Sequence, residues 1–264
     1  MSKTTIHPTA IIGPRTELGE NVTVGPYSII EGEVSIDSGT QIGAHVYIDR
    51  YTHIGKNCRI SPFSAIGTPP QDKKFKGEKT RVVIGDENDI REYVTINRGT
   101  SGGGGTTVLG NQNLLMAYCH VGHDCQLGSG IIMGNVGTLA GHVVLEDYSI
   151  LYGLVGVQPF IRVGAYALIG GGSGVVKDIP PFVKASGDRA GDRVKLFGLN
   201  VIGLKRHDFS DETIAALKKT YQIVFRSHLT IQEAIARVEK EVPSLAEVRR
   251  FLDFIQNSQH GIAR

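Results

Sequence analysis

The chain has 264 residues, a formal net charge of +2 and 41% hydrophobic residues, a composition that supports a packed core and excludes wholesale disorder. The nearly balanced charge gives no sign of a nucleic-acid partner, and no apolar run approaches the roughly 18 residues that cross a bilayer, so we expect no transmembrane segment. Three cysteines without paired spacing and an N-terminus without a hydrophobic signal core argue against a secreted disulfide scaffold, and together they predict a cytoplasmic protein.

A six-residue repeat of aliphatic side chains runs through most of the chain. Every sixth residue from Ile6 to Ile66 is aliphatic, the phase resumes at Ile84, and after a slip of one residue it continues from Leu109 to Val175. This period fits neither an alternating strand nor a helix, so it predicts short strands joined by tight turns. Glycine, 34 residues in all, often follows the aliphatic residue, where the chain bends and a small or φ-permissive residue is favoured. Three such segments close a triangular coil of 18 residues, and stacked coils form a prism over residues 1–187.

Two segments interrupt the repeat. Residues 68–80 are polar, and residues 98–107 contain four consecutive glycines and absorb the slip in phase. Both are expected to be loops that project from a rigid scaffold. Such loops either carry function or are tolerated insertions.

The pattern becomes helical near the C-terminus, which predicts a small α-helical domain over residues 188–264. Ser210 is placed to cap a helix over residues 211–226. The spacings Thr230–Glu233 and Ser244–Glu247 are typical of capping boxes, and each precedes a run with helical apolar periodicity.

The densest group of chemically active side chains lies around His123. Val121 is an inward position, so His123 and Asp124 follow the turn on the outer surface. One coil later the same positions hold Gly141 and His142, and stacking places all four residues in one patch with neighbours about 5 Å apart. A histidine backed by an aspartate acts as a general base, and a neighbouring glycine can offer its N–H to an oxyanion. This combination suits acyl transfer to a hydroxyl or an amine.

Two other interpretations stay open. His120, His123 and His142 could bind zinc, since three histidines and a water form a catalytic site in hexapeptide enzymes of the carbonic anhydrase type. Because His120 flanks Val121 on the side away from His123, a second chain would then have to supply a ligand. The other interpretation is a non-enzymatic scaffold, although a scaffold needs no paired histidine and aspartate.

The chain resembles the UDP-N-acetylglucosamine acyltransferases that begin lipid A biosynthesis, a family of hexapeptide-repeat enzymes. The resemblance spans essentially the whole length. The hexapeptide itself is shared by many acyltransferases, whereas the motifs around His123, His142 and Arg206 are more specific. The matching motifs are His7-Pro8-Thr9-Ala10, Gln71-Asp72, Thr80-Arg81, Asn97-Arg98-Gly99-Thr100, Asn113-Leu114-Leu115-Met116, His123-Asp124-Cys125, Thr138-Leu139-Ala140-Gly141-His142, Gly198-Leu199-Asn200 and Gly203-Leu204-Lys205-Arg206.

The resemblance implies a left-handed parallel β-helix that assembles as a homotrimer, with active sites between subunits and neither cofactor nor metal. The implied reaction transfers a β-hydroxyacyl chain from acyl carrier protein to the glucosamine 3-position of UDP-N-acetylglucosamine, or to its 3-amino analogue, during lipopolysaccharide synthesis. His123 would be the general base, Asp124 its orienting partner and Gly141 the oxyanion donor. Substrate contacts are expected at Asp72, Lys74, His120, His142, Gln158, Gly171, Asn200 and Arg206, with Gly171 at the position that sets acyl length. A basic patch of Arg189, Arg193, Lys195 and Lys205 would contact the acidic carrier protein, unless it is an ordinary solvated face.

Two positions depart from the family pattern. Gln158-Pro159 stands where the family commonly has a His-Gln pair, and Ile202 stands where an acid is usual on the nucleotide side. The nucleotide contacts and the choice between a 3-hydroxyl and a 3-amine acceptor therefore stay open.

Overall fold

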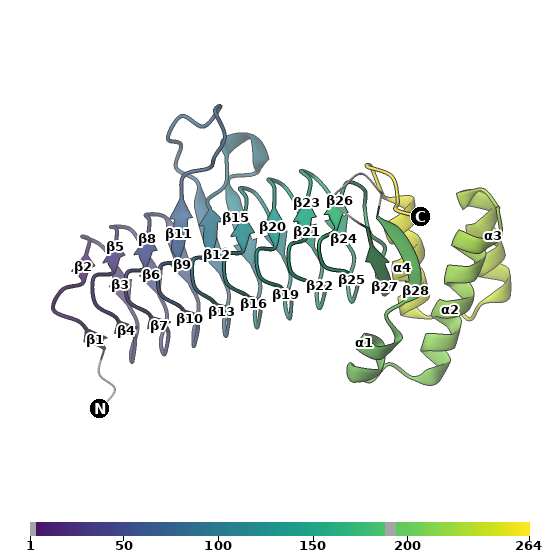
Figure 1. Cartoon of the computed structure of the whole chain (residues 1–264), viewed down its shortest axis with the longest axis horizontal. Coiled ribbons are helices and arrows are strands. Elements are labelled where there is room, and N and C mark those ends of the chain that lie inside the picture. Colours follow the sequence, from purple (N-terminus) through teal and green to yellow (C-terminus); the bar gives the residue numbers. More distant parts are fainter. Residues whose placement is uncertain (1–3, 188–193) are drawn as a thin grey trace.

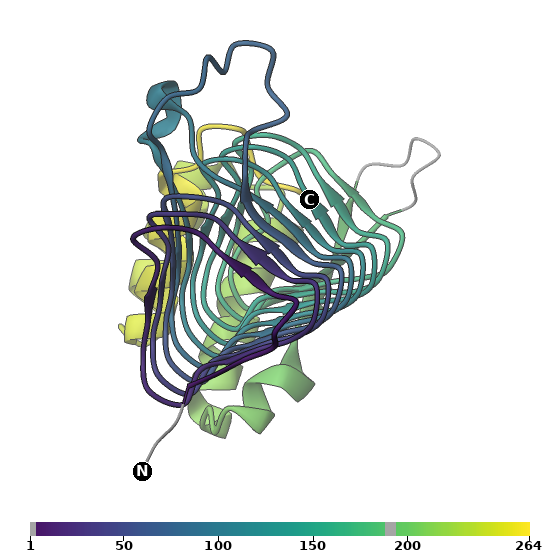
Figure 2. The ribbon, with the colours of Figure 1, turned by 90° about the vertical axis from the view of Figure 1, so that its left-hand side faces the viewer.

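The chain forms a long three-sided prism of short strands with helices gathered at one end (Figure 1). The structure is a computed structural model that describes residues 4–187 and 194–264. Seen along its axis, the prism is a triangle, and two loops project from one corner (Figure 2). The predicted left-handed parallel β-helix and the helical segment after it are confirmed. Within the described ranges, no helix is both long enough and apolar enough to span a bilayer.

Each face of the prism is a sheet in which every strand pairs with the strand one coil away. The first sheet contains β1 (Thr5–Ile6), β4 (Thr23–Val24), β7 (Gln41–Ile42), β10 (Arg59–Ile60), β13 (Asp89–Ile90), β16 (Leu114–Leu115), β19 (Ile132–Met133), β22 (Ile150–Leu151), β25 (Leu168–Ile169), β27 (Val183–Ser186) and β28 (Lys195–Leu199). The second sheet contains β2 (Ile11–Ile12), β5 (Ile29–Ile30), β8 (Tyr47–Ile48), β11 (Ala65–Thr68), β14 (Thr95–Asn97), β17 (His120–Val121), β20 (Thr138–Leu139), β23 (Gly156–Val157) and β26 (Gly174–Val175). The third sheet contains β3 (Glu17–Leu18), β6 (Ser35–Ile36), β9 (Thr52–Ile54), β12 (Arg81–Ile84), β15 (Thr106–Leu109), β18 (Gln126–Leu127), β21 (Val144–Leu145) and β24 (Arg162–Val163).

The aliphatic repeat fills the axis of the prism. Ile30 pairs with Ile48, Ile48 pairs with Ile66, and all three side chains are fully buried. Where the two loops intervene, the pairing continues in register, because Ile66 pairs with Ile96 and Ile96 pairs with Val121. The loops therefore leave the scaffold intact and are extruded from one edge, between the second and third sheets.

Glycine is needed at the bends mainly for its small size and not for its backbone freedom. The left-handed φ values at the turns belong mostly to larger residues, among them Tyr27 (59°), Asp124 (60°) and His142 (63°). Glycine is needed instead where two coils approach each other closely. A Cβ atom on Gly134 would lie 2.5 Å from the backbone nitrogen of Gly153, which is closer than any real contact.

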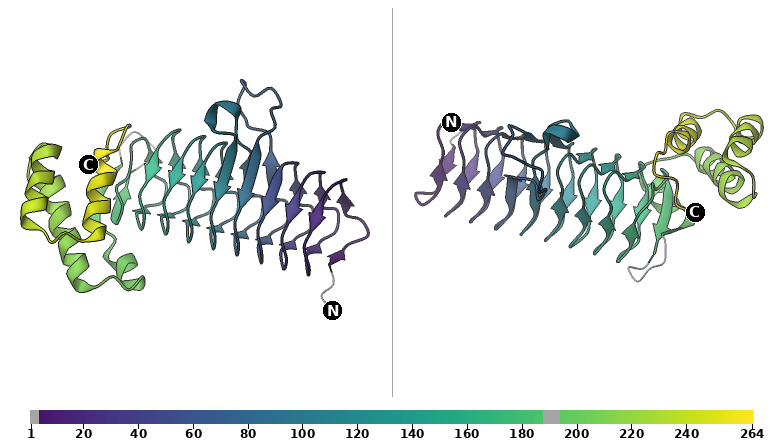
Figure 3. Two further views of the ribbon diagram at one scale, coloured as in Figure 1. Left: turned by 180° about the vertical axis from the view of Figure 1, so that it is seen from behind. Right: turned by 90° about the horizontal axis from the view of Figure 1, so that it is seen from above.

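The segment after the prism begins with a strand rather than a helix. Strand β28 runs antiparallel to β27, with Leu199 opposite Val183, and α1 (Val201–Arg206) follows it. The other helices are α2 (Asp211–Arg226), α3 (Ile231–Glu241) and α4 (Ala246–Gln256). They lie together beyond the last coils (Figure 3).

Two of the three predicted caps are confirmed. The Ser210 side chain accepts from the Thr213 N–H at the start of α2, and Thr230 forms a full capping box at the start of α3. The third prediction is wrong. Helix α4 has Leu245 at its N-cap and no side-chain cap there, since Leu245 packs against the core and thereby shifts the start of the helix past Ser244.

Ion pairs and the C-terminal tail tie the helices to the prism. Glu146 on the prism accepts from Arg162 at 3.0 Å and from Arg250 of α4 at 2.9 Å. Near the C-terminus, Ile262 forms a β-bridge with Asp178. The helical segment is therefore held against the last coils.

We expect Gly134→Ala to lower the free energy of unfolding by about 1–3 kcal/mol, because its methyl group would meet the backbone of the next coil. Gly156→Ala is the matched control, since no atom lies within 4 Å of the position its Cβ would occupy. Urea unfolding of the two variants should therefore show a lowered midpoint for Gly134→Ala alone. Equal midpoints would refute the steric role assigned to glycine.

Candidate active site

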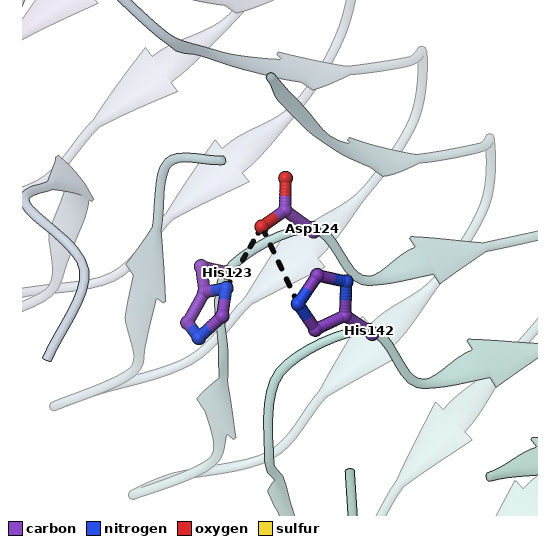
Figure 4. Close-up of side chains that lie close together, drawn as sticks. All are labelled: His123, Asp124 and His142. Atoms are coloured by element: carbon purple, nitrogen blue, oxygen red, sulfur yellow. Dashed lines mark hydrogen bonds and ion pairs between the residues drawn. The ribbon is translucent and has the colours of Figure 1, made fainter. Parts of the chain in front are cut away.

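A turn with a left-handed backbone conformation brings the side chains of two consecutive residues into contact. His123 and Asp124 lie between β17 and β18, and Asp124 has a φ of 60°. Adjacent side chains on an extended strand point to opposite faces, so a strand alone would separate these two groups. The turn instead brings His123 Nδ1 to 2.8 Å from Asp124 Oδ2 (Figure 4).

The Asp124 carboxylate is fully buried and held by the second loop. The Thr100 N–H lies 2.9 Å from Oδ1 and 3.0 Å from Oδ2, and the Thr100 hydroxyl donates to Oδ2 at 2.7 Å. The backbone N–H of Asp124 donates to Thr107 Oγ1 at 2.8 Å. A buried carboxylate is costly unless its oxygens are hydrogen-bonded, and the N–H and hydroxyl of Thr100 meet that need for Oδ1 and Oδ2.

His142 lies one coil further on, beside the same carboxylate. Its Nε2 atom is 3.9 Å from Asp124 Oδ2, and its ring meets the His123 ring edge-on, with centroids 5.0 Å apart. Phe160 stacks on the His142 ring, with ring centroids 4.4 Å apart. His123, Asp124 and His142 thus form a cluster that Phe160 borders. Burial lowers the pKa of His142, and the charge of His123 lowers it further, while the charge of Asp124 raises it.

Gly141 lies directly against the His123 ring. A Cβ atom at this position would come within 2.6 Å of both Cε1 and Nε2 of His123, so no larger residue leaves the ring in place. Among the residues that the structure describes, the Gly141 N–H donates to no backbone or side-chain acceptor. Gly141 therefore combines close approach to the imidazole with a backbone N–H that is not used among the described residues.

His120 lies near this group but outside it. It is half-buried on β17, and its Nδ1 atom is 2.7 Å from the Thr95 hydroxyl. Burial lowers its pKa, and the charge of His123 adds to that effect. Within residues 4–187 and 194–264, the side chains whose ligand atoms lie within 4.8 Å of one another are those of His123, Asp124 and His142. A metal centre would therefore use an aspartate in place of the third histidine considered from the sequence.

The first loop, between β11 and β12, approaches the cluster from the same edge. The charge of Asp72 opposes the lowering of the His142 pKa that burial causes. The Lys74 N–H donates to Asp72 Oδ1 at 3.0 Å, and the Lys74 side chain is exposed. The Ser101 hydroxyl of the second loop donates to Glu78 of the first at 3.2 Å, which links the two loops.

Sequence reasoning missed the residues that support this site from the loops. Arg98 is buried, donates to Asp49 Oδ2 at 3.1 Å and lies 5.6 Å from the Phe75 ring of the first loop. Thr100 holds the carboxylate of Asp124. Both residues belong to the Asn97–Thr100 motif, which was the only available signal, because the repeat does not reveal how an extruded loop folds back.

The other predicted substrate residues lie in later turns of the prism and at the start of the helical segment. Gln158 is exposed in the turn after β23, and Gly171 is exposed in the turn after β25, on a different edge. Asn200 is buried, where it caps α1 by accepting from the Gly203 N–H at 3.2 Å and donates to the Tyr166 carbonyl at 3.0 Å.

The predicted basic patch is only partly described. Lys195 on β28 and Arg206 at the end of α1 are exposed, and Lys205 forms an exposed ion pair with Asp211 at 3.2 Å. Arg189 and Arg193 lie outside the described residues.

Comparison with known proteins gives close matches. One family model, described as UDP-N-acetylglucosamine O-acyltransferase, domain 2, matches residues 178–263, and a bacterial transferase hexapeptide model matches residues 15–50. An acyl-(acyl-carrier-protein)–UDP-N-acetylglucosamine O-acyltransferase from Thermodesulfovibrio yellowstonii is 53% identical over 98% of this chain and 99% of its own. A protein of the same name from a Janthinobacterium species is 51% identical with the same coverage. The solved structure of a UDP-N-acetylglucosamine acyltransferase from Bacteroides fragilis is 42% identical, with a TM-score of 0.94 over 98% of this chain and 99% of that one.

We expect the charge of His123 to lower the titration midpoints of two neighbouring imidazoles, His120 and His142. In a pH titration followed by NMR of 15N-labelled histidines, His120 and His142 should have midpoints below the ordinary value of 6.5. His123→Ala should raise both midpoints, because the charge of His123 lowers both pKa values. Asp124→Asn should lower the midpoint of His142 further, because it removes the charge that raises it. Midpoints that stay unchanged in both variants would show that the rings are not coupled.

Proposed function

This chain belongs to the family of acyl-(acyl-carrier-protein)–UDP-N-acetylglucosamine O-acyltransferases, and we propose that His123 is the general base of its transfer reaction. The donor is an acyl chain carried by acyl carrier protein, here proposed to be a β-hydroxyacyl chain. The acceptor is UDP-N-acetylglucosamine, at the 3-position of its glucosamine. The relatives are named O-acyltransferases, which favours the 3-hydroxyl over the 3-amine as the acceptor group. The observation that carries the mechanism is the buried His123–Asp124 pair.

Asp124 prepares His123 to accept a proton. Because a carboxylate only accepts hydrogen bonds, the contact to Nδ1 places the ring proton there and leaves the lone pair on Nε2. Nε2 takes the proton of the acceptor hydroxyl as its oxygen attacks the thioester carbonyl carbon. When the tetrahedral intermediate collapses, the C–S bond breaks and the imidazolium returns the proton to the leaving sulfur. Asp124 stabilises the imidazolium between the two steps.

Gly141 is the proposed oxyanion donor. Gly141 lies against the ring of the base, and its N–H is not used by another acceptor among the described residues. A fixed donor aimed at the developing negative charge stabilises the transition state without reorganisation.

The remaining predicted contacts are proposed to bind the two substrates. Asp72 and Lys74 of the first loop would hold the glucosamine, since this loop is extruded from the same edge of the prism that carries His123 and Asp124. Asn200 orders the start of α1, which presents the exposed Arg206 to the nucleotide or the carrier. The other proposed contacts are His120, Gln158 and Gly171 for the substrates, and Lys195 and Lys205, with Arg189 and Arg193, for the acidic carrier protein.

A ladder of exposed rings supports the proposed homotrimer. Tyr27, His45, Phe63, Tyr93 and Tyr118 stack at 4.7–5.1 Å along the edge between the first and second sheets. The four tyrosine and phenylalanine rings are 43–60% exposed. A contiguous apolar strip of this kind is usually covered by a partner, and we propose that second and third copies of the chain cover it.

The cysteines support the proposed cytoplasmic location. Cys58, Cys119 and Cys125 are unpaired and buried. Burial raises the pKa of Cys119 to about 11 and that of Cys125 to about 12, so both stay protonated and neither is a nucleophile.

We expect His123→Ala to lower the rate of acyl transfer at least about 100-fold, the usual contribution of a general base, while the fold is retained. His53→Ala is the matched control, because His53 also lies near an aspartate, with Nε2 3.8 Å from Asp37, but on an exposed face. The assay is mass spectrometry of the products of UDP-N-acetylglucosamine and β-hydroxyacyl carrier proteins. Full activity of His123→Ala would refute the proposed mechanism.

The zinc-dependent alternative is tested separately. The cluster could hold a metal, but Nδ1 of His123 and Oδ2 of Asp124 already share a hydrogen bond, and Oδ2 accepts from Thr100 as well. We therefore expect acyl transfer to survive exhaustive treatment with a chelator. Loss of transfer that added zinc restores, with one zinc per chain by elemental analysis, would favour the metal enzyme.

A further inference from the structure

The Asp124 carboxylate lies near two imidazoles and forms a hydrogen bond with one of them. Its Oδ2 atom is 2.8 Å from His123 Nδ1 and 3.9 Å from His142 Nε2, and both rings lie on the same side of it (Figure 4). Of these two rings, the one that lies against the backbone of Gly141 is that of His123. A modest rotation of the carboxylate would pair it with His142 instead and leave His123 without a partner. The structure must therefore contain something that fixes this rotation.

Thr100 fixes both carboxylate oxygens at once. Its N–H donates to Oδ1 and Oδ2, and its hydroxyl donates to Oδ2. Gly103, in the short 3-10 helix η1 (Ser101–Gly103), closes the remaining side. A Cβ atom on Gly103 would collide with the carboxylate of Asp124 and with Cε1 of His142. The loop backbone thus lies directly against the carboxylate and leaves it no room to turn.

The position of Thr100 is itself fixed by buried contacts. Its carbonyl accepts from the N–H groups of Gly103 and Gly105 at 3.1 and 2.9 Å. Two residues earlier, Arg98 is anchored by its buried ion pair with Asp49, and its N–H donates to the Thr68 carbonyl at 3.0 Å. The backbone of Thr100 is therefore held by contacts that do not involve the Asp124 carboxylate.

We propose that Thr100 is a positioning residue that directs Asp124 to His123 and away from His142. This inference rests on the proposed role of His123 as the general base. Thr100 acts through Asp124, and its contribution is realised when the imidazolium forms. Its loss should therefore reduce turnover rather than substrate binding.

The test compares Thr100→Val, which removes the hydroxyl and keeps the shape, with Thr100→Ser, which keeps the hydroxyl. We expect kcat to fall about 10–100-fold in Thr100→Val, the range for a lost hydrogen bond to a charged group, with KM for UDP-N-acetylglucosamine changed less than about threefold. Thr100→Ser should stay within about threefold of the parent in both constants. Thr40→Val is the matched control, because the buried Thr40 hydroxyl donates to the Gly55 carbonyl at 2.7 Å far from the site. It should reduce stability without changing kcat.

Each of the other outcomes would overturn either the role of Thr100 or the proposed function. A parent-like kcat in Thr100→Val, with His123→Ala inactive, would overturn the inference and leave the proposed function standing. Equal losses in Thr100→Val and Thr100→Ser, or a rise in KM as large as the fall in kcat, would show general damage to the loop and would also overturn it. An active His123→Ala would instead overturn the proposed function. If Thr100→Val does not fold, Thr100→Ala removes the same hydroxyl with a smaller side chain and should lower kcat in the same selective way; an unchanged kcat there would refute the inference.

Discussion

In-register stacking of the coils is the constraint on which the rest of this structure depends. Because each inward aliphatic side chain pairs with the one in the next coil, every residue has a fixed neighbour one coil away, as His120 pairs with Thr138 and Val121 with Leu139. The spacing between strands leaves no freedom to adjust that neighbour. The same constraint that buries the core therefore places Gly141 against His123 and His142 beside Asp124. It also explains why glycine is needed where turns of adjacent coils touch, as at Gly134.

A rigid prism by itself would leave the His123–Asp124 pair exposed at a corner. The two extruded loops change that environment. The second loop buries the Asp124 carboxylate and supplies its hydrogen bonds, and the first loop covers the second through Glu78 and the ring of Phe75. Burial strengthens the electrostatic interaction between Asp124 and His123, because the local dielectric constant is lower than that of water. The coils therefore set the positions of His123 and Asp124, and the loops set the environment of these two side chains.

Most of the scaffold could be predicted from the sequence, because a repeat of six specifies strand length, inward positions and stacking together. The patch of His123, Asp124, Gly141 and His142 followed from that stacking alone. The loop contacts could not be predicted, since Arg98 and Thr100 reach their partners by a path that has no periodicity. The start of α4 was misplaced for a related reason: the packing of Leu245, a tertiary contact, outweighs the local capping signal of Ser244. The left-handed φ at larger residues was also missed, because those positions are imposed by the geometry of the corner rather than by residue preference.

In the proposed mechanism, Asp124 holds the proton of His123 on Nδ1 and leaves Nε2 ready to accept one, and this arrangement can be observed. It is tested most directly by 15N NMR of the histidine-labelled enzyme at neutral pH, with the His123 signals assigned by their loss in His123→Ala. We expect Nδ1 of His123 to carry the proton and Nε2 to show the shift of an unprotonated nitrogen. A neutral His123 with its proton on Nε2 would contradict this mechanism, because that ring could not remove a proton from the acceptor hydroxyl.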